Sequence, residues 1–257
     1  MFDWLKSFRK RGGTLALPPR EERAARNTGV VNLKPYTPDP IKFLGQLAYL
    51  QLSNFEILTN EIKYSPSMTD KAELSECAAR AFDEYRAIAK KLEHEGVQVT
   101  EAMEPFKERI NNFHSLTKGI DWYENILKVY LVTGLLDDFY VRLAVGLNPI
   151  LRADIEKALA DKTIDRFAKR VLLAAMADNP QLASRLALWG RRIMGEALLE
   201  LRAAFDNRKL AGVAKTRALS AEEERRVNLD SYSKLEPLIT ELIGAHSLRM
   251  DAIGLPA

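Results

Sequence analysis

Apolar residues follow a helical period through most of the chain, and one stretch is apolar around most of its circumference. This stretch, residues 121–144, reads DWYENILKVYLVTGLLDDFYVRLA and contains no proline. A helix that is apolar nearly all round is typical of the centre of a helical protein. Carboxylates inside such a helix need a partner or a metal. The pattern therefore predicts a central helix, and it makes Glu124 and Asp138 candidates for a buried polar network.

Helix start and stop signals divide the chain after residue 38. Asp39 with Pro40 forms an N-cap and first-turn pair, Gly96 stands at a C-terminal capping position, and Ser220 with Glu223 forms a capping box. The expected helices cover residues 39–64, 69–95, 100–114, 121–146, 149–161, 163–178, 181–206 and 220–250. No short β-branched, alternating run lies between turn signals. The pattern favours an all-α fold, an antiparallel helical bundle with additional C-terminal helices.

The segment before the bundle, residues 1–38, has a different character. Its second half is rich in proline, which favours extended backbone and turns. Its beginning is amphipathic, with apolar and basic residues side by side: Phe2, Trp4, Leu5, Phe8, Lys6, Arg9, Lys10 and Arg11. This pattern fits an interfacial membrane anchor, a basic arm that contacts a partner or RNA, or a simple tail. We predict a flexible arm and linker at 1–38 and a bundle domain at 39–257.

Composition and charge narrow the functional class. The formal net charge of the 257 residues is +3, so the molecule as a whole is not a polycationic nucleic-acid binder, and any basic effect is local. The single cysteine, Cys77, excludes an intrachain disulfide. No apolar run reaches a membrane-spanning length, and the N-terminus lacks the apolar core of a signal peptide. We expect a cytoplasmic protein that is peripheral to the membrane if its N-terminus binds lipid.

Carboxylates inside a bundle of long helices raise the hypothesis of a di-iron centre. Di-iron bundle proteins take a Glu from each of two helices and a Glu-x-x-His pair from each of the other two. The chain has three histidines, at positions 94, 114 and 246, and none has an acidic residue three positions earlier. The usual ligand pattern is therefore missing from this sequence.

Four stretches occur in the order of a known family. They are AMEPF at 102–106, NFHSLTKGIDWYENILKVYLVTGLLDDFY at 112–140, RLALWGRRIMGEAL at 185–198 and AHSLRMDAIGL at 245–255. Together they resemble the bacterial ferritin-like family related to the tRNA hydroxylase that acts on isopentenyl-type modified adenosines. The resemblance implies a ferritin-like bundle and, for the catalytic members, a di-iron centre that activates dioxygen.

The resemblance also implies which positions would hold the iron. They fall on Gln51, Ala81, Glu84, Glu124, Asp161 and Ile164. Gln51 replaces a glutamate with a neutral amide, and Ile164 stands where a histidine would be and cannot coordinate. The resemblance therefore implies a degraded site, for which no metal cofactor is expected. If the chemistry of the family is retained, two iron ions would bind instead.

An arginine in the bundle could supply the charge that a metal would have carried. Arg192 and Glu196 are four residues apart on one expected helix and could pair there. Alternatively, Arg192 could reach Glu124 or Asp138 across the core. We predict a structural ion pair among these four residues.

Three functions follow from these patterns. The favoured one is a non-catalytic ferritin-like protein that binds an unknown protein partner or a membrane surface. The second is an iron-dependent monooxygenase that hydroxylates a hypermodified adenosine of tRNA. The third is a bundle whose emptied metal cavity binds a small apolar molecule, because an alanine and an isoleucine at former ligand positions make that cavity less polar.

Overall fold

The computed structural model describes residues 38–203 and 219–257. The amphipathic residues at positions 2–11, which we expect to contact a membrane or a partner, lie outside the described residues. The described part contains helices and no strand. The helices are α2 Pro40–Ile62, α3 Met68–His94, α4 Val99–Leu116, α5 Trp122–Ala144, α6 Pro149–Ala158, α7 Thr163–Met176, α8 Pro180–Ala203 and α10 Ala221–Ala252. The predicted all-α class is confirmed.

Local capping explains where several helices begin and end. The Asp39 side chain accepts a hydrogen bond from the Lys42 backbone N–H at 3.0 Å. The predicted capping box of Ser220 and Glu223 is present at the start of α10. Gly96 has a φ of +71° directly after α3, a conformation that favours glycine. The start of α3 differs slightly from the expectation, because Ser67 rather than a later residue caps it.

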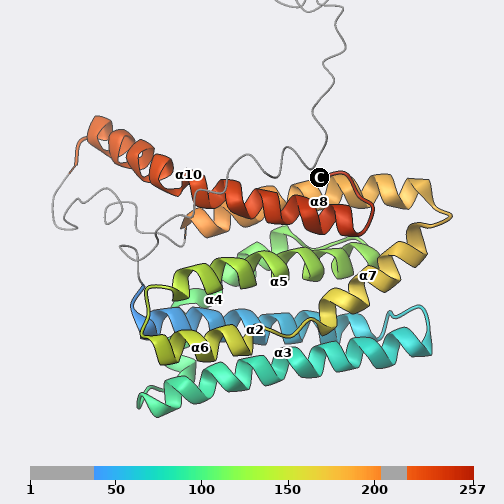
Figure 1. Cartoon of the computed structure of the whole chain (residues 1–257), viewed down its shortest axis with the longest axis horizontal. Coiled ribbons are helices and arrows are strands. Elements are labelled where there is room, and N and C mark those ends of the chain that lie inside the picture. The colour runs from blue at the N-terminus through green and yellow to red at the C-terminus, as the bar shows by residue number, and fades with distance from the viewer. Residues whose placement is uncertain (1–37, 204–218) are drawn as a thin grey trace, which may run out of the picture.

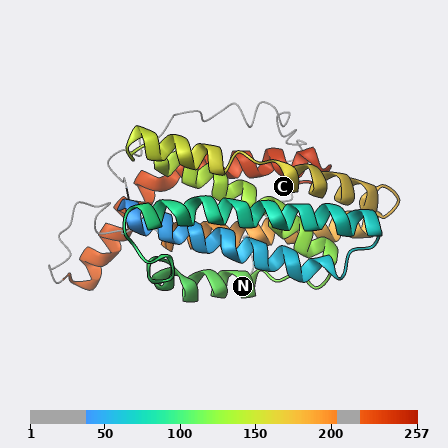
Figure 2. The ribbon, with the colours of Figure 1, turned by 90° about the horizontal axis from the view of Figure 1, so that it is seen from below.

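The helices are arranged around α5 (Figure 1). α2 and α3 lie antiparallel on one side of it, and α8 and α10 cover the other side. α4 packs along α2, whereas α6 and α7 run beside α3 and α5, as the view from below also shows (Figure 2). This arrangement is the antiparallel bundle with additional C-terminal helices that the helical pattern predicts.

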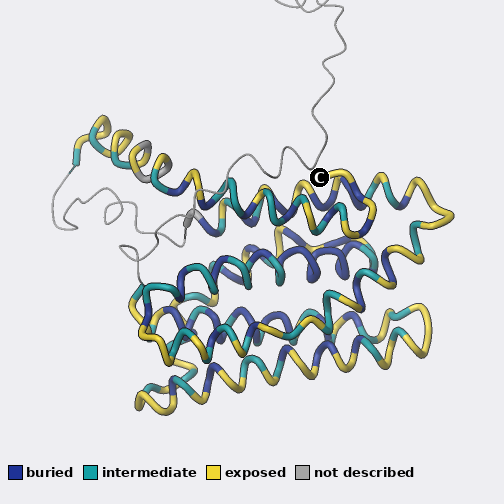
Figure 3. Tube along the Cα trace, viewed as in Figure 1, coloured by how far each residue is buried: buried dark blue, intermediate teal, exposed yellow. Residues whose placement is uncertain are grey.

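The core follows α5 along its length. Its residues from Trp122 to Val132 are all buried except Tyr123, and burial continues through Tyr140 to Ala144 on the inward faces (Figure 3). The prediction of a central helix at 121–144 is confirmed. Within the described ranges, no helix has the length and apolar character needed to cross a membrane.

Candidate functional site

A small cavity lies between α2, α3, α5 and the connection from α6 to α7. Its volume is about 20 Å³, the space of roughly one water molecule. It is lined by Gln51, Asn54, Leu58, Cys77, Arg80, Ala81, Glu84, Val129, Thr133, Asp161 and Ile164. The fold thus brings together five of the six positions that the resemblance implies as former iron ligands. We call this space the central cavity.

The wall that α2 contributes to the central cavity is neutral. Gln51 is only 2% exposed, and its side-chain oxygen accepts a hydrogen bond from the Asn54 amide at 3.1 Å. The two amides therefore satisfy part of each other's hydrogen-bonding capacity within one helix. Opposite them, Ala81 of α3 and Ile164 of α7 offer no donor atom. Half of the expected ligand positions cannot supply a charged ligand.

Glu84 and Asp161 of the central cavity are crowded together with Asp137, which lies near the cavity but does not line it. Burial, together with the negative charges of Asp137 and Asp161, raises the pKa of Glu84 to about 8, against the opposing effect of Lys162. Burial likewise raises the pKa of Asp137 to about 7, although the Lys162 ammonium lies 4.0 Å away. Near neutral pH, Glu84 therefore carries a proton for much of the time.

Two further groups at the central cavity have structural roles. The Asp161 carboxylate accepts a hydrogen bond from the Thr163 backbone N–H at 2.7 Å at the start of α7. Cys77 is a buried free cysteine, and burial followed by the charge of Asp161 raises its pKa to about 12. A thiol with such a pKa stays protonated and is a poor metal ligand.

The residues around the central cavity do not fit a di-iron centre. None of the chain's histidines lines it, so the nitrogen ligands of the usual centre are missing. In the part of the chain that the structure describes, no group of three His, Cys, Asp or Glu side chains is placed to hold a metal ion. The cavity volume also leaves room for one small atom rather than a pair of ions with their waters.

Glu124 lies outside the central cavity, which corrects its expected place among the former ligands. It stands in the first turn of α5, where its Oε2 accepts a hydrogen bond from the Ile120 backbone N–H at 2.9 Å. The Asp121 side chain in turn accepts from the Glu124 backbone N–H at 3.0 Å. An acid three residues after an N-cap commonly bonds back to the preceding loop, and that local signal identifies the role of Glu124. The α5 positions at the cavity are Val129 and Thr133.

The predicted ion pair involving Arg192 does not form. Arg192 is exposed and its guanidinium stacks over the Trp189 ring, 5.3 Å from the ring centre. The two acids have other partners: the buried Glu124 lies 3.5 Å from Nε of Arg185 on α8, and the partly exposed Asp138 lies 2.5 Å from Arg249 on α10. Arg192 and Trp189 are three residues apart on α8, so the exposed arginine covers the ring of the buried tryptophan. The sequence pattern missed both Arg185 and Arg249.

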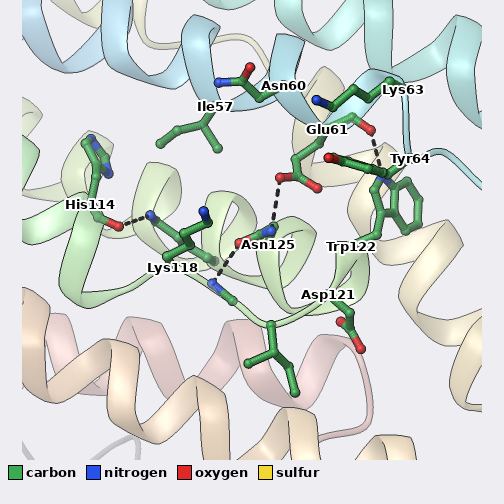
Figure 4. Close-up of a pocket in the computed structure, with 13 residues that line it drawn as sticks. Ile57, Asn60, Glu61, Lys63, Tyr64, His114, Lys118, Asp121, Trp122 and Asn125 are labelled. Carbon is green, nitrogen blue, oxygen red and sulfur yellow. Dashed lines mark hydrogen bonds between the residues drawn. The ribbon is translucent and has the colours of Figure 1, made fainter.

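A second, larger hollow opens at one end of the bundle (Figure 4). Its volume is about 760 Å³. It is lined by Ile57, Asn60, Glu61, Lys63, Tyr64, His114, Lys118, Gly119, Ile120, Asp121, Trp122, Asn125 and Lys128. We call it the end pocket. It was not expected from the sequence, although Lys128 within the apolar run of the central helix is a signal that could have indicated it.

Hydrogen bonds fix the walls of the end pocket. The Asn125 amide donates to Oε1 of Glu61 at 3.0 Å and its oxygen accepts from the Gly119 backbone N–H at 2.8 Å. The Trp122 indole donates to the Glu61 carbonyl at 3.2 Å. These bonds, drawn in Figure 4, tie the end of α2 to the start of α5, and the start of α5 to the loop between α4 and α5.

Comparison with known proteins identifies the family. A comparison with curated proteins finds no matching sequence. A family model described as a ferritin-like domain of actinomycetes matches residues 35–216. This match spans more than half of the chain and includes the helices on every side of the central cavity. The chain therefore belongs to this actinomycete family of ferritin-like domains.

Proposed function

We propose that this protein is a non-catalytic member of the ferritin-like superfamily that acts by binding a partner instead of activating dioxygen. The observation that carries the proposal is the set of side chains at the central cavity. A neutral amide, an alanine and an isoleucine stand at three of the positions where the resemblance implies iron ligands. Of the acids that remain, Glu84 has a raised pKa and Asp161 accepts a hydrogen bond from the Thr163 backbone N–H.

The chemistry of these groups opposes a pair of ferrous ions. Each ion would need charged oxygen or nitrogen ligands on several sides, whereas only α3 and the α6–α7 connection present carboxyls to the cavity. Binding would also have to displace the proton that the raised pKa of Glu84 favours. A bundle that keeps its fold and loses these ligands is suited to binding through its surface.

The alternative of an apolar ligand in the central cavity does not fit its dimensions. A volume of about 20 Å³ is far below the roughly 300 Å³ at which small-molecule pockets begin. The lining also contains acids, amides and an arginine. We therefore do not propose a lipid chain or a similar molecule for this cavity.

Iron loading of the full-length chain tests the proposal. The purified protein would be incubated with ferrous iron without oxygen, freed of unbound metal and assayed for iron, and its dioxygen consumption would then be followed. Glu84→Gln is the matched variant, since it removes the carboxyl that α3 presents to the cavity and keeps the shape of the side chain. We expect little iron and no dioxygen uptake in either protein.

A defined outcome of iron loading would contradict the non-catalytic function. About two irons per chain that disappear in Glu84→Gln, together with dioxygen uptake, would overturn the proposal and favour the tRNA monooxygenase. In that case, the modified adenosines of tRNA would also differ between cells with and without the gene. Identical nucleoside profiles are expected under the non-catalytic function.

A further inference from the structure

We propose that the end pocket binds a small organic anion with an apolar body, and that the ammonium groups of Lys128 and Lys118 hold its carboxylate or phosphate. This inference goes beyond the proposed function, because the end pocket is separate from the central cavity and nothing in its chemistry depends on iron. Three features of the end pocket support it: one buried cation, the charge balance of the lining and the apolar wall beside the cations.

Lys128 is a buried cation that forms no ion pair within the described residues, although the charge of Glu61 acts on it at longer range. It is 3% exposed, and its ammonium donates to the carbonyl oxygen of His114 at 3.0 Å. No carboxylate of the described ranges lies within the 4.0 Å of an ion pair. A buried ammonium carries three donors and is costly without a counter-charge. Burial accordingly lowers its pKa to about 8. An anion in the end pocket would supply the missing charge.

Two other lysines add positive charge to the same lining. Lys63 and Lys118 are both exposed and both line the end pocket. Lys63 lies 4.8 Å from the centre of the Tyr64 ring, and Lys118 is close enough to Lys128 to lower its pKa. Figure 4 shows Lys118 with His114 on one side of the hollow and Glu61 on the other. Lys118 and Lys128 thus form a pair of cations at one side of the pocket.

The acids of the lining do not cancel this charge. Asp121 is paired with Arg185 and caps the first turn of α5. Glu61 is held by the Asn125 amide at 3.0 Å, and burial raises its pKa, so it prefers its proton more than an exposed glutamate does. Three lysines therefore face a single carboxylate that is not engaged with an arginine. The imbalance favours an anionic ligand.

An apolar wall stands beside the cations. Ile57, Tyr64, Ile120 and Trp122 line the end pocket, and two of them are conspicuously exposed, Tyr64 at 60% and Ile120 at 80%. A ligand with an aromatic or aliphatic body would cover these side chains while its acidic group meets the lysines. The volume of about 760 Å³ lies in the usual range of roughly 300–1,000 Å³ for small-molecule sites.

Two dyes that differ by one charged group test the inference. Anilinonaphthalene sulfonate is an aromatic anion, and phenylnaphthylamine has the same rings without the sulfonate; both fluoresce on binding. We would titrate each into the full-length protein and into Lys118→Met, Lys128→Met and the control Lys107→Met, an exposed lysine of α4 outside the end pocket. Phenyl phosphate and benzoate would then compete with the anionic dye, to distinguish a phosphate from a carboxylate ligand.

We expect Lys118→Met and Lys128→Met each to weaken binding of the sulfonate by about tenfold and to leave the neutral dye unchanged. Lys107→Met should change neither. Equal affinity of the anionic dye for all four proteins, or an equal loss for both dyes, would overturn the inference. Should Lys128→Met fail to fold, the exposed Lys118 still decides the outcome. The outcome of iron loading at the central cavity does not affect dye binding at the end pocket. The proposed function and this inference can therefore fail separately.

Discussion

Arg249 of α10 donates a hydrogen bond to Asp138 of α5, with 2.5 Å between Nη2 and Oδ2. The arginine crosses α5 at Gly134, where an added Cβ would lie only 2.2 Å from Nε of Arg249. The Tyr130 hydroxyl donates to the backbone carbonyl of Arg249 at 3.0 Å. One residue of the last helix thus contacts the central helix over three of its turns.

Breaking this contact should loosen α10 from the bundle. We predict that Arg249→Met and Asp138→Asn each lower the free energy of unfolding by about 1–2 kcal/mol, with a coupling of about 1 kcal/mol in a double-mutant cycle. Urea unfolding measures both quantities. The exposed pair Arg226 and Glu222, 3.8 Å apart on α10, serves as control and should show a coupling near zero. An equal coupling in the two cycles would contradict the prediction.

The two arginines of α8 should behave differently. Arg185→Met leaves the buried Glu124 without its cation, and we expect a loss of about 2 kcal/mol, less than for a fully buried pair because Arg185 is 39% exposed. Arg192→Met removes only a stacking contact with Trp189 and should cost less than about 1 kcal/mol. Thermal and urea unfolding of the two variants provide the comparison. A larger loss of stability for Arg192→Met than for Arg185→Met would contradict this prediction and favour an ion pair at Arg192.

Glu84 should make the protein less stable as the pH rises. Its folded pKa of about 8 lies above the ordinary value of 4.5, so the folded state binds more protons between these limits. The stability that this group contributes is fully present below about pH 4.5 and is lost as the pH rises through about 8. Glu84→Gln cannot ionise and should therefore be more stable than the natural chain by about 1–2 kcal/mol near pH 9.

Unfolding at several pH values checks this linkage. The difference between Glu84→Gln and the natural chain should be small at about pH 5 and grow steadily toward about pH 9. A difference that stays constant with pH would show that the variant changes packing and not ionisation.

Two glycines in helices should respond in opposite directions to alanine. A Cβ at Gly45 of α2 would lie 2.2 Å from the backbone oxygen of Ala102, so the helices α2 and α4 would have to separate. We predict a loss of about 2–3 kcal/mol for Gly45→Ala. Gly195 of α8 is exposed and has nothing within 4 Å of the added carbon, so Gly195→Ala should gain about 0.5–1 kcal/mol. The melting temperatures of the two variants would show the contrast.

The sequence predicts the helices well because their signals are local. The expected central helix at 121–146 is found as Trp122–Ala144, and the Ser220 capping box stands where it was expected. Capping residues and the helical period act within a few neighbours along the chain, so no tertiary information is needed to recognise them. Five of the six implied ligand positions also meet at one cavity, because they lie on inward faces of neighbouring elements.

The position of Glu124 shows where this approach fails. Glu124 stands five positions before Val129, one of the two α5 residues at the central cavity, and each residue turns a helix by about 100°. A prediction can therefore assign a residue to the correct helix and still place its side chain at the wrong height along the helix and on the wrong face. The same holds for Arg192, which lies on the correct helix but points outward.

The sequence by itself determined an all-α bundle, its helix boundaries and the lack of the usual iron ligands. The tertiary structure alone decided that Arg185 pairs with Glu124 and Arg249 with Asp138, that Glu84 and Asp137 crowd each other, and that Lys128 borders a hollow. The physical reason is that helix formation depends on residues three and four apart, whereas these contacts depend on how the helices cross. The rotation of each helix about its axis is set only when all of them pack together.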